Sequence, residues 1–507
     1  FTSDCSAILM QSYFEKTGAD NSNLAGYMVA SAAFFFAVVF VVSSGMGFKW
    51  LFLSCIALIA LCVAAVFPNF RLFVLLSLTA CIPVAIQYNL FNHGSKTSTL
   101  THFGGAEGSL VINLVDFPII MLFFIWIGDL ASNKIALPKW TRIDTYIVLF
   151  LLFSALSMFN TDEYALLFFE ELRYLKYFLL LWMLRCYMVD EQFVRYCLYV
   201  VVLIAGMQFL LACLQYFLFF TLPFPVGGVS GSQFDMVNNA VIQRVSGTVG
   251  HCNTFAAYLL FPIVLCLVFF LFESSRWIRF LASGFFVACC MALVLTFSRN
   301  AWLMTFLAVS ILLVVGVIQK KISSGMLLGL FGLGMLILGG LIVSGVFEII
   351  IIRIFEDSGK AYDSRWDLAM VAVSMMLEHP ILGIGLNSFE ESMSYYDDSG
   401  VTNIIQQPVH NTLLLIGAET GLIAFTLFML ICKSVAGNVI SLIKRGDDFG
   451  FIVGVSTGVV LLLLLLSNQF DVTLRKEPII GMCVLFIAIV MAMESRANKD
   501  FSDEKYN

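Results

Sequence analysis

Apolar runs of about 20 residues recur along the whole chain and constrain its fold more than any other feature. Each run is long enough to cross the hydrocarbon core of a membrane as a helix. The sequence therefore predicts an all-α, polytopic membrane bundle of about 12–14 transmembrane helices, since a β-barrel would show shorter alternating segments. The individual runs predict spans near 27–43, 51–67, 71–91, 110–130, 144–159, 172–189, 196–220, 253–273, 278–297, 301–318, 326–347, 411–432, 451–467 and 478–493.

The composition agrees with a membrane protein and argues against several other classes. The 507 residues are 60% hydrophobic and 12% charged, whereas an ordinary soluble protein has roughly 25% charged residues. The net charge of −6 and the lack of a basic stripe argue against a nucleic-acid partner. The 13 cysteines lie mostly inside apolar runs, and no CxxC pair or His/Cys cluster is present, so we expect no disulfide framework and no zinc or other metal site. We also expect no cofactor.

The basic residues predict how the chain is oriented in the membrane. Alternate connections are basic, and the positive-inside rule assigns these to the cytoplasm. The opposite side then carries the longest connection, at about 348–410. We expect three regions: N-terminal transmembrane helices in 1–220, a catalytic core in 221–432 that includes this outer loop, and C-terminal transmembrane helices with a cytoplasmic tail in 433–507.

A histidine directly precedes an apolar run in the stretch "QQPVHNTLLLIG". Polar groups at membrane depth need partners or a task. His410 follows Pro408 and precedes a helical pattern, so we expect it near a helix N-terminus that Asn411 can cap. The positive end of the helix dipole disfavours imidazolium, and a neutral imidazole can act as a general base. A purely local role, as a cap or a hydrogen-bonding group, is the alternative.

Several arginines lie close to apolar spans on the outer side, where basic residues should be scarce: Arg244, Arg299, Arg353 and Arg365. A single one could be an interfacial arginine that reaches lipid headgroups. A cluster of them suits a diphosphate, because the planar guanidinium donates bidentate hydrogen bonds to phosphate oxygens. In the outer loop, Glu390 and Glu391 could supply a supporting carboxylate or form a solvated face.

Four motifs follow one another along the chain: "RVSGTVGHCN", "TFSRNAWL", "DSRWDLAMVAVSMMLEHPILGIGLNSF" and "HNTLLLIGAETGL". In this order they resemble the O-antigen ligase and O-antigen polymerase superfamily of membrane glycosyltransferases. The resemblance covers roughly 240–430, and its last two motifs are the more specific. The flanking helices agree only in general character.

The resemblance implies a GT-C type transferase in the bacterial inner membrane, with its active site facing the periplasm. Such enzymes take glycan from undecaprenyl diphosphate by a metal-independent, inverting reaction. Ligases pass the glycan to lipid A–core, and polymerases pass it to another lipid-linked repeat unit. Carried over by motif, Arg299 and Arg365 match essential arginines and His410 matches the essential histidine. Arg244 matches a further diphosphate-contacting arginine, and Asn411, Glu390, Glu391 and Arg353 are possible supporting residues.

Three functional alternatives stay open at the level of sequence. A repeat-unit polymerase for O-antigen or exopolysaccharide would use the same donor chemistry as a ligase. A transporter or lipid flippase would place charged or broken positions at mid-span along a pathway, whereas the apolar centres here are largely uninterrupted. A structural or assembly role would make substitution of the outer arginines nearly neutral. We favour the ligase, with lipid-linked glycan and membrane lipids as its partners.

Overall fold

A computed structural model describes residues 69–92, 109–222, 233–237, 240–322, 324–343, 345–354, 359–403 and 407–506. The predicted spans 27–43 and 51–67 lie outside these described residues. The chain divides into two compact units, residues 1–77 and 78–507. Every residue of the candidate site lies in the second unit, which the following paragraphs concern. The division into three functional regions stays a prediction.

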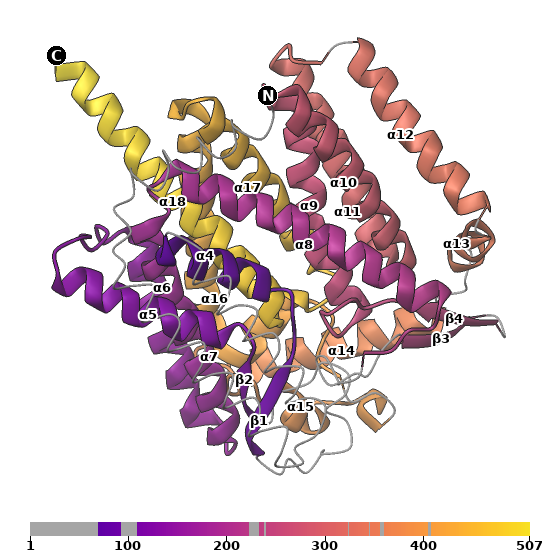
Figure 1. Ribbon diagram of the computed structural model, residues 1–507. Coiled ribbons are helices and arrows are strands. Elements are labelled where there is room, and N and C mark those ends of the chain that lie inside the picture. The colour runs from indigo at the N-terminus through magenta and orange to yellow at the C-terminus, as the bar shows by residue number, and fades with distance from the viewer. Residues whose placement is uncertain are drawn as a thin grey trace, which may run out of the picture. The chain divides into compact units, whose positions relative to one another are not determined.

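Helices make up most of the described chain (Figure 1). Eight of the described helices are long and apolar enough to cross a membrane. The prediction of an all-α, polytopic membrane bundle is confirmed. The helices of the bundle are α5 (Asp116–Ala131), α6 (Arg142–Leu156), α7 (Tyr164–Tyr187), α8 (Glu191–Phe217), α9 (Cys252–Phe272), α10 (Arg276–Leu295), α11 (Arg299–Ile318), α12 (Ser324–Val343), α16 (Thr412–Arg445), α17 (Asp448–Ser467) and α18 (Glu477–Tyr506).

The predicted span 71–91 is wrong. Helix α4 (Phe70–Cys81) ends two residues before Pro83, and the chain then enters strand β1 (Gln87–Asn92). Proline has no backbone N–H and disfavours helical geometry in the residue before it, so the apolar run cannot continue as one helix. Strand β1 pairs antiparallel with β2 (Ser109–Asn113). A second hairpin, which the sequence analysis also missed, pairs β3 (Gln233–Val237) with β4 (Ala240–Arg244).

Helix α7 begins at Tyr164, eight residues before the predicted span 172–189. Its first half carries several charged residues, and the structure places three of them, Glu170, Arg173 and Lys176, in ion pairs. Arg173 forms a buried ion pair with Glu170, and Lys176 lies 3.0 Å from the carboxylates of Asp116 and Glu477. Buried charges in a helix bundle need such partners, so pairing explains how this charged helix fits into the bundle.

The predicted outer loop at about 348–410 contains regular structure. Helix α14 packs against α16, and this contact positions the segment that precedes His410. The described elements of the connection and of the short turns are α13 (Val346–Ile354), α14 (Gly359–Glu378), α15 (Phe389–Ser392), and the 3₁₀ turns η1 (Ser157–Asn160), η2 (Met393–Tyr395), η3 (Val401–Asn403) and η4 (Thr473–Arg475).

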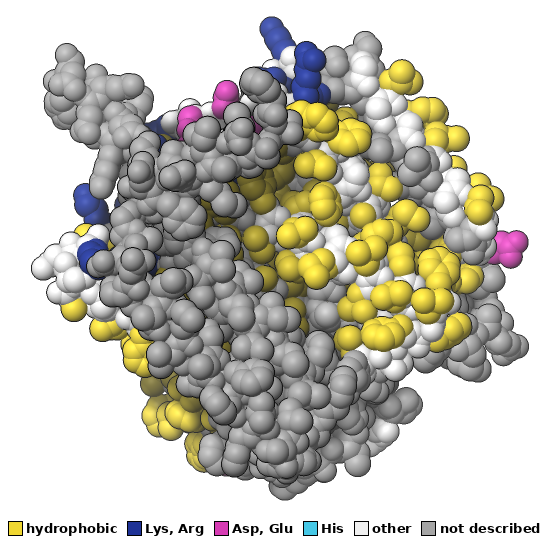
Figure 2. Space-filling model, in the orientation of Figure 1, with side chains coloured by type: hydrophobic (Ala, Val, Ile, Leu, Met, Phe, Trp, Pro, Cys, Tyr) yellow, Lys and Arg dark blue, Asp and Glu magenta, His cyan; other side chains and the backbone are white. Residues whose placement is uncertain are grey.

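The centre of the bundle is helix α9, almost all of whose residues are buried. It packs against α8, α10, α11 and α17. Outward-facing apolar side chains on the surrounding helices include Met207, Phe306 and Phe331, which are 60%, 70% and 68% exposed. Figure 2 shows hydrophobic side chains spread over the face formed by α8 and α10–α12. A face of this composition suits contact with lipid tails.

Candidate functional site

His410 lies immediately before the N-terminus of α16 and is half-buried. The side chain of Asn411 accepts hydrogen bonds from the backbone N–H groups of Leu413 and Leu414, which confirms Asn411 as the cap. His410 Nδ1 lies 3.0 Å from the carbonyl oxygen of Pro408. Because a carbonyl can only accept, Nδ1 is the donor in this bond. The neutral ring then carries no proton on Nε2, which is the state that a general base needs.

The N-terminus of α16 is fixed to the C-terminal end of α17. The Thr412 backbone N–H donates to the Asn468 carbonyl over 2.8 Å, and the Thr412 hydroxyl donates to Asn468 Oδ1 over 3.0 Å. Asn411 Nδ2 also donates to Gln469 Oε1. Three donor groups, one of Asn411 and two of Thr412, thus hold the two residues that follow His410. The position of this segment is therefore set by helices and not by a free loop.

The start of α11 joins the same end of the bundle. Asn300 Nδ2 donates to the carbonyl oxygen and to the hydroxyl of Ser467, over 3.0 and 2.9 Å. Ser467 directly precedes Asn468, which holds Thr412. Arg299 is the first residue of α11 and is exposed. The C-terminal end of α17 therefore ties together the helix starts that carry Arg299 and His410.

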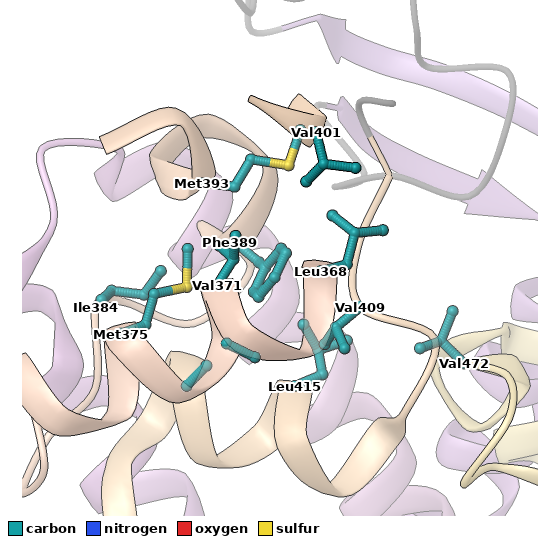
Figure 3. Packing of buried hydrophobic residues seen from close by; sticks show 12 residues of the cluster. Leu368, Val371, Met375, Ile384, Phe389, Met393, Val401, Val409, Leu415 and Val472 are labelled. Atoms are coloured by element: carbon teal, nitrogen blue, oxygen red, sulfur yellow. The ribbon is translucent and has the colours of Figure 1, made fainter. Parts of the chain in front are cut away.

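Arg365 lies in α14, which packs against α16. It is exposed and lies one turn before Leu368. Leu368 belongs to a buried cluster that also holds Val409, the residue before His410, and Leu415 of α16. Figure 3 shows Leu368, Val409 and Leu415 close to one another where α14 meets the start of α16. The hydrophobic cluster thus fixes the helix that bears Arg365 against the helix that His410 precedes.

Of the three candidate arginines whose side chains the structure describes, Arg244 is the most buried. At the end of β4, its Nε donates to the Thr296 carbonyl over 2.8 Å and its Nη2 donates to Asn253 Oδ1 over 2.6 Å. These bonds connect β4 and the first turn of α9 to the turn that precedes Arg299. Arg244 therefore has a clear structural task next to the candidate site.

Replacement of Arg244 should lower stability, which separates it from the exposed arginines. Arg244→Ala removes two hydrogen bonds from a charged donor, each contributing about 1.5–3 kcal/mol. We expect a clear loss of thermal stability in detergent for Arg244→Ala and little rescue by Arg244→Lys, because an ammonium cannot reproduce the forked geometry. Arg299→Ala is the matched comparison, and equal unfolding temperatures for the two alanine variants would contradict this assignment.

The remaining predicted site residues belong to the outer connection at about 348–410. Glu390 and Glu391 lie in the short helix α15, both partly buried. Arg353 belongs to α13, and its side chain lies outside the described part of the structure. Among the described residues, no group of three or more His, Cys, Asp or Glu side chains could hold a metal ion.

The glycines of the motif "HPILGIGLNSF" allow the backbone of this segment to lie directly against the backbone of α16. Helix α16 breaks at Gly421, whose φ is +74°, and the segment 380–385 fits against this break. The backbone N–H groups of Ile384 and Gly385 donate to the carbonyls of Ala418 and Glu419, both over 3.0 Å. A Cβ at Gly383 would lie 2.4 Å from the carbonyl carbon and oxygen of Glu419. Only glycine allows this docking, so the motif shapes the fold around the site.

A buried polar network beside this loop escaped the sequence analysis. Arg475 Nη1 donates to Glu419 Oε1 over 3.2 Å, and its Nη2 donates to Asn387 Oδ1 over 2.6 Å. Glu170 lies 3.9 Å from Arg475 Nε. Burial disfavours the charged form of Arg475, but the carboxylates of Glu419 and Glu170 outweigh it and raise the pKa above its ordinary value. The charged residues within "GAETGL" and "TLRKEP", which lie in or beside apolar runs, were the sequence signal that could have indicated this network.

Comparison with known proteins assigns part of the chain to a family. Residues 284–429 match the family model described as O-antigen ligase. The matched stretch contains Arg299, Arg365, His410 and the glycine break of α16. Over these residues the chain is similar to the O-antigen ligase and polymerase superfamily. No curated protein matches the chain.

Proposed function

We propose that the protein is an O-antigen ligase-like glycosyltransferase that moves glycan from undecaprenyl diphosphate to a lipid A–core acceptor. In this proposal the reaction takes place at the periplasmic face of the bacterial inner membrane. The family match over 284–429 supports ligase- or polymerase-type activity. The observation that carries the proposed site is the junction of α11, α16 and α17, which brings the helix starts at Arg299 and His410 to one end of the bundle.

The proposed chemistry is a single inverting displacement. The acceptor hydroxyl donates its proton to His410 Nε2, and the hydroxyl oxygen attacks C1 of the donor sugar from the face opposite the diphosphate. The bond between C1 and the diphosphate oxygen breaks, and its electron pair stays with the leaving group. Guanidinium groups of Arg299 and Arg365 stabilise the growing negative charge of that leaving group. His410 afterwards loses the proton to solvent.

Loss of either exposed arginine should slow transfer without unfolding the protein. We expect Arg299→Ala and Arg365→Ala each to lower the rate by roughly 10²–10³, the usual effect of removing one preorganised donor from a developing anion. Lysine variants should recover part of this rate, because they keep the charge and lose the fork. The measurement is the initial rate of glycan transfer by purified protein in lipid nanodiscs.

Arg276→Ala is the matched control for Arg299→Ala. Arg276 is also exposed and also the first residue of a long apolar helix, α10, at the end opposite the start of α11. We expect its replacement to leave transfer unchanged. Equal losses for Arg276→Ala and Arg299→Ala would point to a general effect of surface charge and would remove the support for diphosphate binding by Arg299.

The choice between ligase and polymerase is decided by the acceptor. Purified protein receives undecaprenyl-diphosphate-linked glycan in EDTA, with lipid A–core and a second lipid-linked repeat unit offered separately. Transfer to lipid A–core is the expected result and makes the protein a metal-independent ligase. Ladder growth on the lipid-linked repeat would instead make it a polymerase that uses the same donor chemistry.

A further inference from the structure

A cavity lies between strand β2, helix α7 and the first residues of α5 and α18, and none of its lining residues belongs to the site around His410. Its volume is about 140 Å³, which at about 30 Å³ per molecule is space for roughly five water molecules. Five charged side chains and one aromatic ring are among the residues that line it: Asp116, Glu170, Arg173, Lys176, Glu477 and Phe169. None of these residues has a role in the displacement described above.

The charged wall of this cavity is rigid because its members hold one another. Lys176 Nζ donates to Asp116 Oδ1 and to Glu477 Oε1, each over 3.0 Å. Asn113 Nδ2 donates to the other Glu477 oxygen over 2.6 Å, and the Asn113 backbone N–H donates to Asp116 Oδ2 over 2.8 Å. Asp116 and Glu477 each begin a helix, where the dipole stabilises a carboxylate. A wall of this kind is already ordered before any ligand arrives.

The balance of charge indicates which ligands the cavity suits. Its three carboxylates and two cationic groups give a net charge of −1, which disfavours a diphosphate or another multivalent anion. Carboxylates accept hydrogen bonds from hydroxyl groups, and ammonium and guanidinium groups donate to hydroxyl or ring oxygens. A molecule with many neutral hydroxyl groups can therefore use both signs of charge on this wall.

The other wall is apolar and comes partly from the same helix. Phe169 is half-buried, and Leu172 is 36% exposed at the cavity. A sugar ring has hydroxyl edges and an apolar C–H face, and an aromatic ring beside polar groups matches both. The cavity and the candidate catalytic site are linked by one short segment. Asn468, which holds Thr412, and Glu477, which lines the cavity, are its two ends.

We infer that this cavity binds a sugar unit of the glycan substrate at a distance from the reacting bond. The inference rests on the proposed function for the source of that sugar, which is either the donor glycan or the acceptor oligosaccharide. Binding energy from a remote sugar would align the substrate for the displacement, and it would give the enzyme selectivity for glycan structure without a contact to the diphosphate.

The test fills the cavity without breaking its ion pairs. Leu172→Trp places a larger side chain at the cavity. Leu179→Trp is the matched control, because it makes the same change two turns further along α7 at a side chain that is 39% exposed and does not line the cavity. Both changes are made in a His410→Ala background so that no transfer consumes the ligand. The probe is the oligosaccharide released by mild acid from the surface polysaccharide of the producing cells, and calorimetry gives its Kd.

We expect Leu172→Trp to weaken oligosaccharide binding by about tenfold or more, since a filled pocket cannot bury the ligand, and Leu179→Trp to leave it unchanged. Inorganic diphosphate should not compete. Equal affinity in the two variants, competition by diphosphate, or no saturable binding to protein with an open cavity would overturn the inference. If the protein binds the oligosaccharide in the cavity but transfers no glycan, sugar binding by the cavity is supported and the proposed function is wrong. The inference and the proposed function can therefore fail separately.

With active protein, the same pair of variants identifies the source of the sugar. A raised KM for the lipid-linked donor in Leu172→Trp assigns the cavity to the donor glycan. A raised KM for the acceptor assigns it to the acceptor oligosaccharide. An unchanged KM for both substrates would contradict the inference.

Discussion

Replacement of His410 by alanine should reduce glycan transfer by roughly 10²–10⁴, the range that a positioned general base contributes. The protein should remain folded, because the half-buried ring makes one local hydrogen bond, to Pro408, while Asn411 and Thr412 hold the helix start. His410→Gln should be equally inactive, since an amide can fill the space and donate a hydrogen bond but cannot take up the proton. The measurement is the initial transfer rate at saturating donor and acceptor.

His379→Ala is the control for this experiment. His379 also belongs to the outer connection, where its ring lies 6.3 Å from the ring of Tyr396, and it has no place in the proposed displacement. Its replacement should leave the transfer rate close to that of the unmodified protein. Activity of His410→Gln near the original level would show that the histidine only positions its neighbours, and the general-base assignment would then be wrong.

Replacement of Gly383 by alanine should severely impair folding. A side chain at this position meets the backbone of Glu419 at 2.4 Å, and the φ of +70° is unfavourable for any L side chain. Left-handed geometry and overpacking together cost about 2–5 kcal/mol, which is a large share of the stability of a typical protein. We expect a large fall in the yield of monodisperse protein and in its unfolding temperature.

Gly400→Ala separates the cost of left-handed backbone geometry from the cost of overpacking. Gly400 has a similar φ of +76°, but a Cβ there would meet only Asn403 Nδ2, at 3.8 Å. It should therefore show the conformational strain alone, about 1–2 kcal/mol. If Gly383→Ala and Gly400→Ala unfold at the same temperature, the close contact between the loop and the break in α16 does not contribute to stability as we describe.

The bundle could be predicted from sequence because a membrane imposes a simple length rule on apolar runs. The rule failed at 71–91, where the run is continuous in composition but Pro83 ends the helix and a hairpin strand follows. It also misplaced the start of α7, because charges at Glu170, Arg173 and Lys176 lower the apolarity of residues that are nevertheless helical. Composition alone does not reveal that these charges are neutralised by partners elsewhere in the chain.

In the candidate site, too, some features could be predicted from sequence and others could not. His410, Arg299 and Arg365 stand in local motifs, so sequence alone could propose them, and their roles stay predictions. Asn411 was correctly expected as the helix cap. The network around Arg475 joins residues as far apart as Glu170 and Arg475, and the cavity wall joins Asp116 to Glu477 through Lys176. Such pairs depend on which helices become neighbours, and a single sequence does not contain that information in local form.

The most direct test of the central claim is a transfer assay with a defined donor. Purified protein in nanodiscs receives undecaprenyl-diphosphate-linked glycan and lipid A–core in EDTA, and the products are analysed for released undecaprenyl diphosphate and for the configuration of the new linkage. We expect equal amounts of released diphosphate lipid and glycosylated acceptor, an inverted anomeric centre, and loss of both products in His410→Ala. Absence of transfer to either lipid A–core or a lipid-linked repeat by folded protein, or full activity of His410→Ala, would refute the proposed glycan transfer.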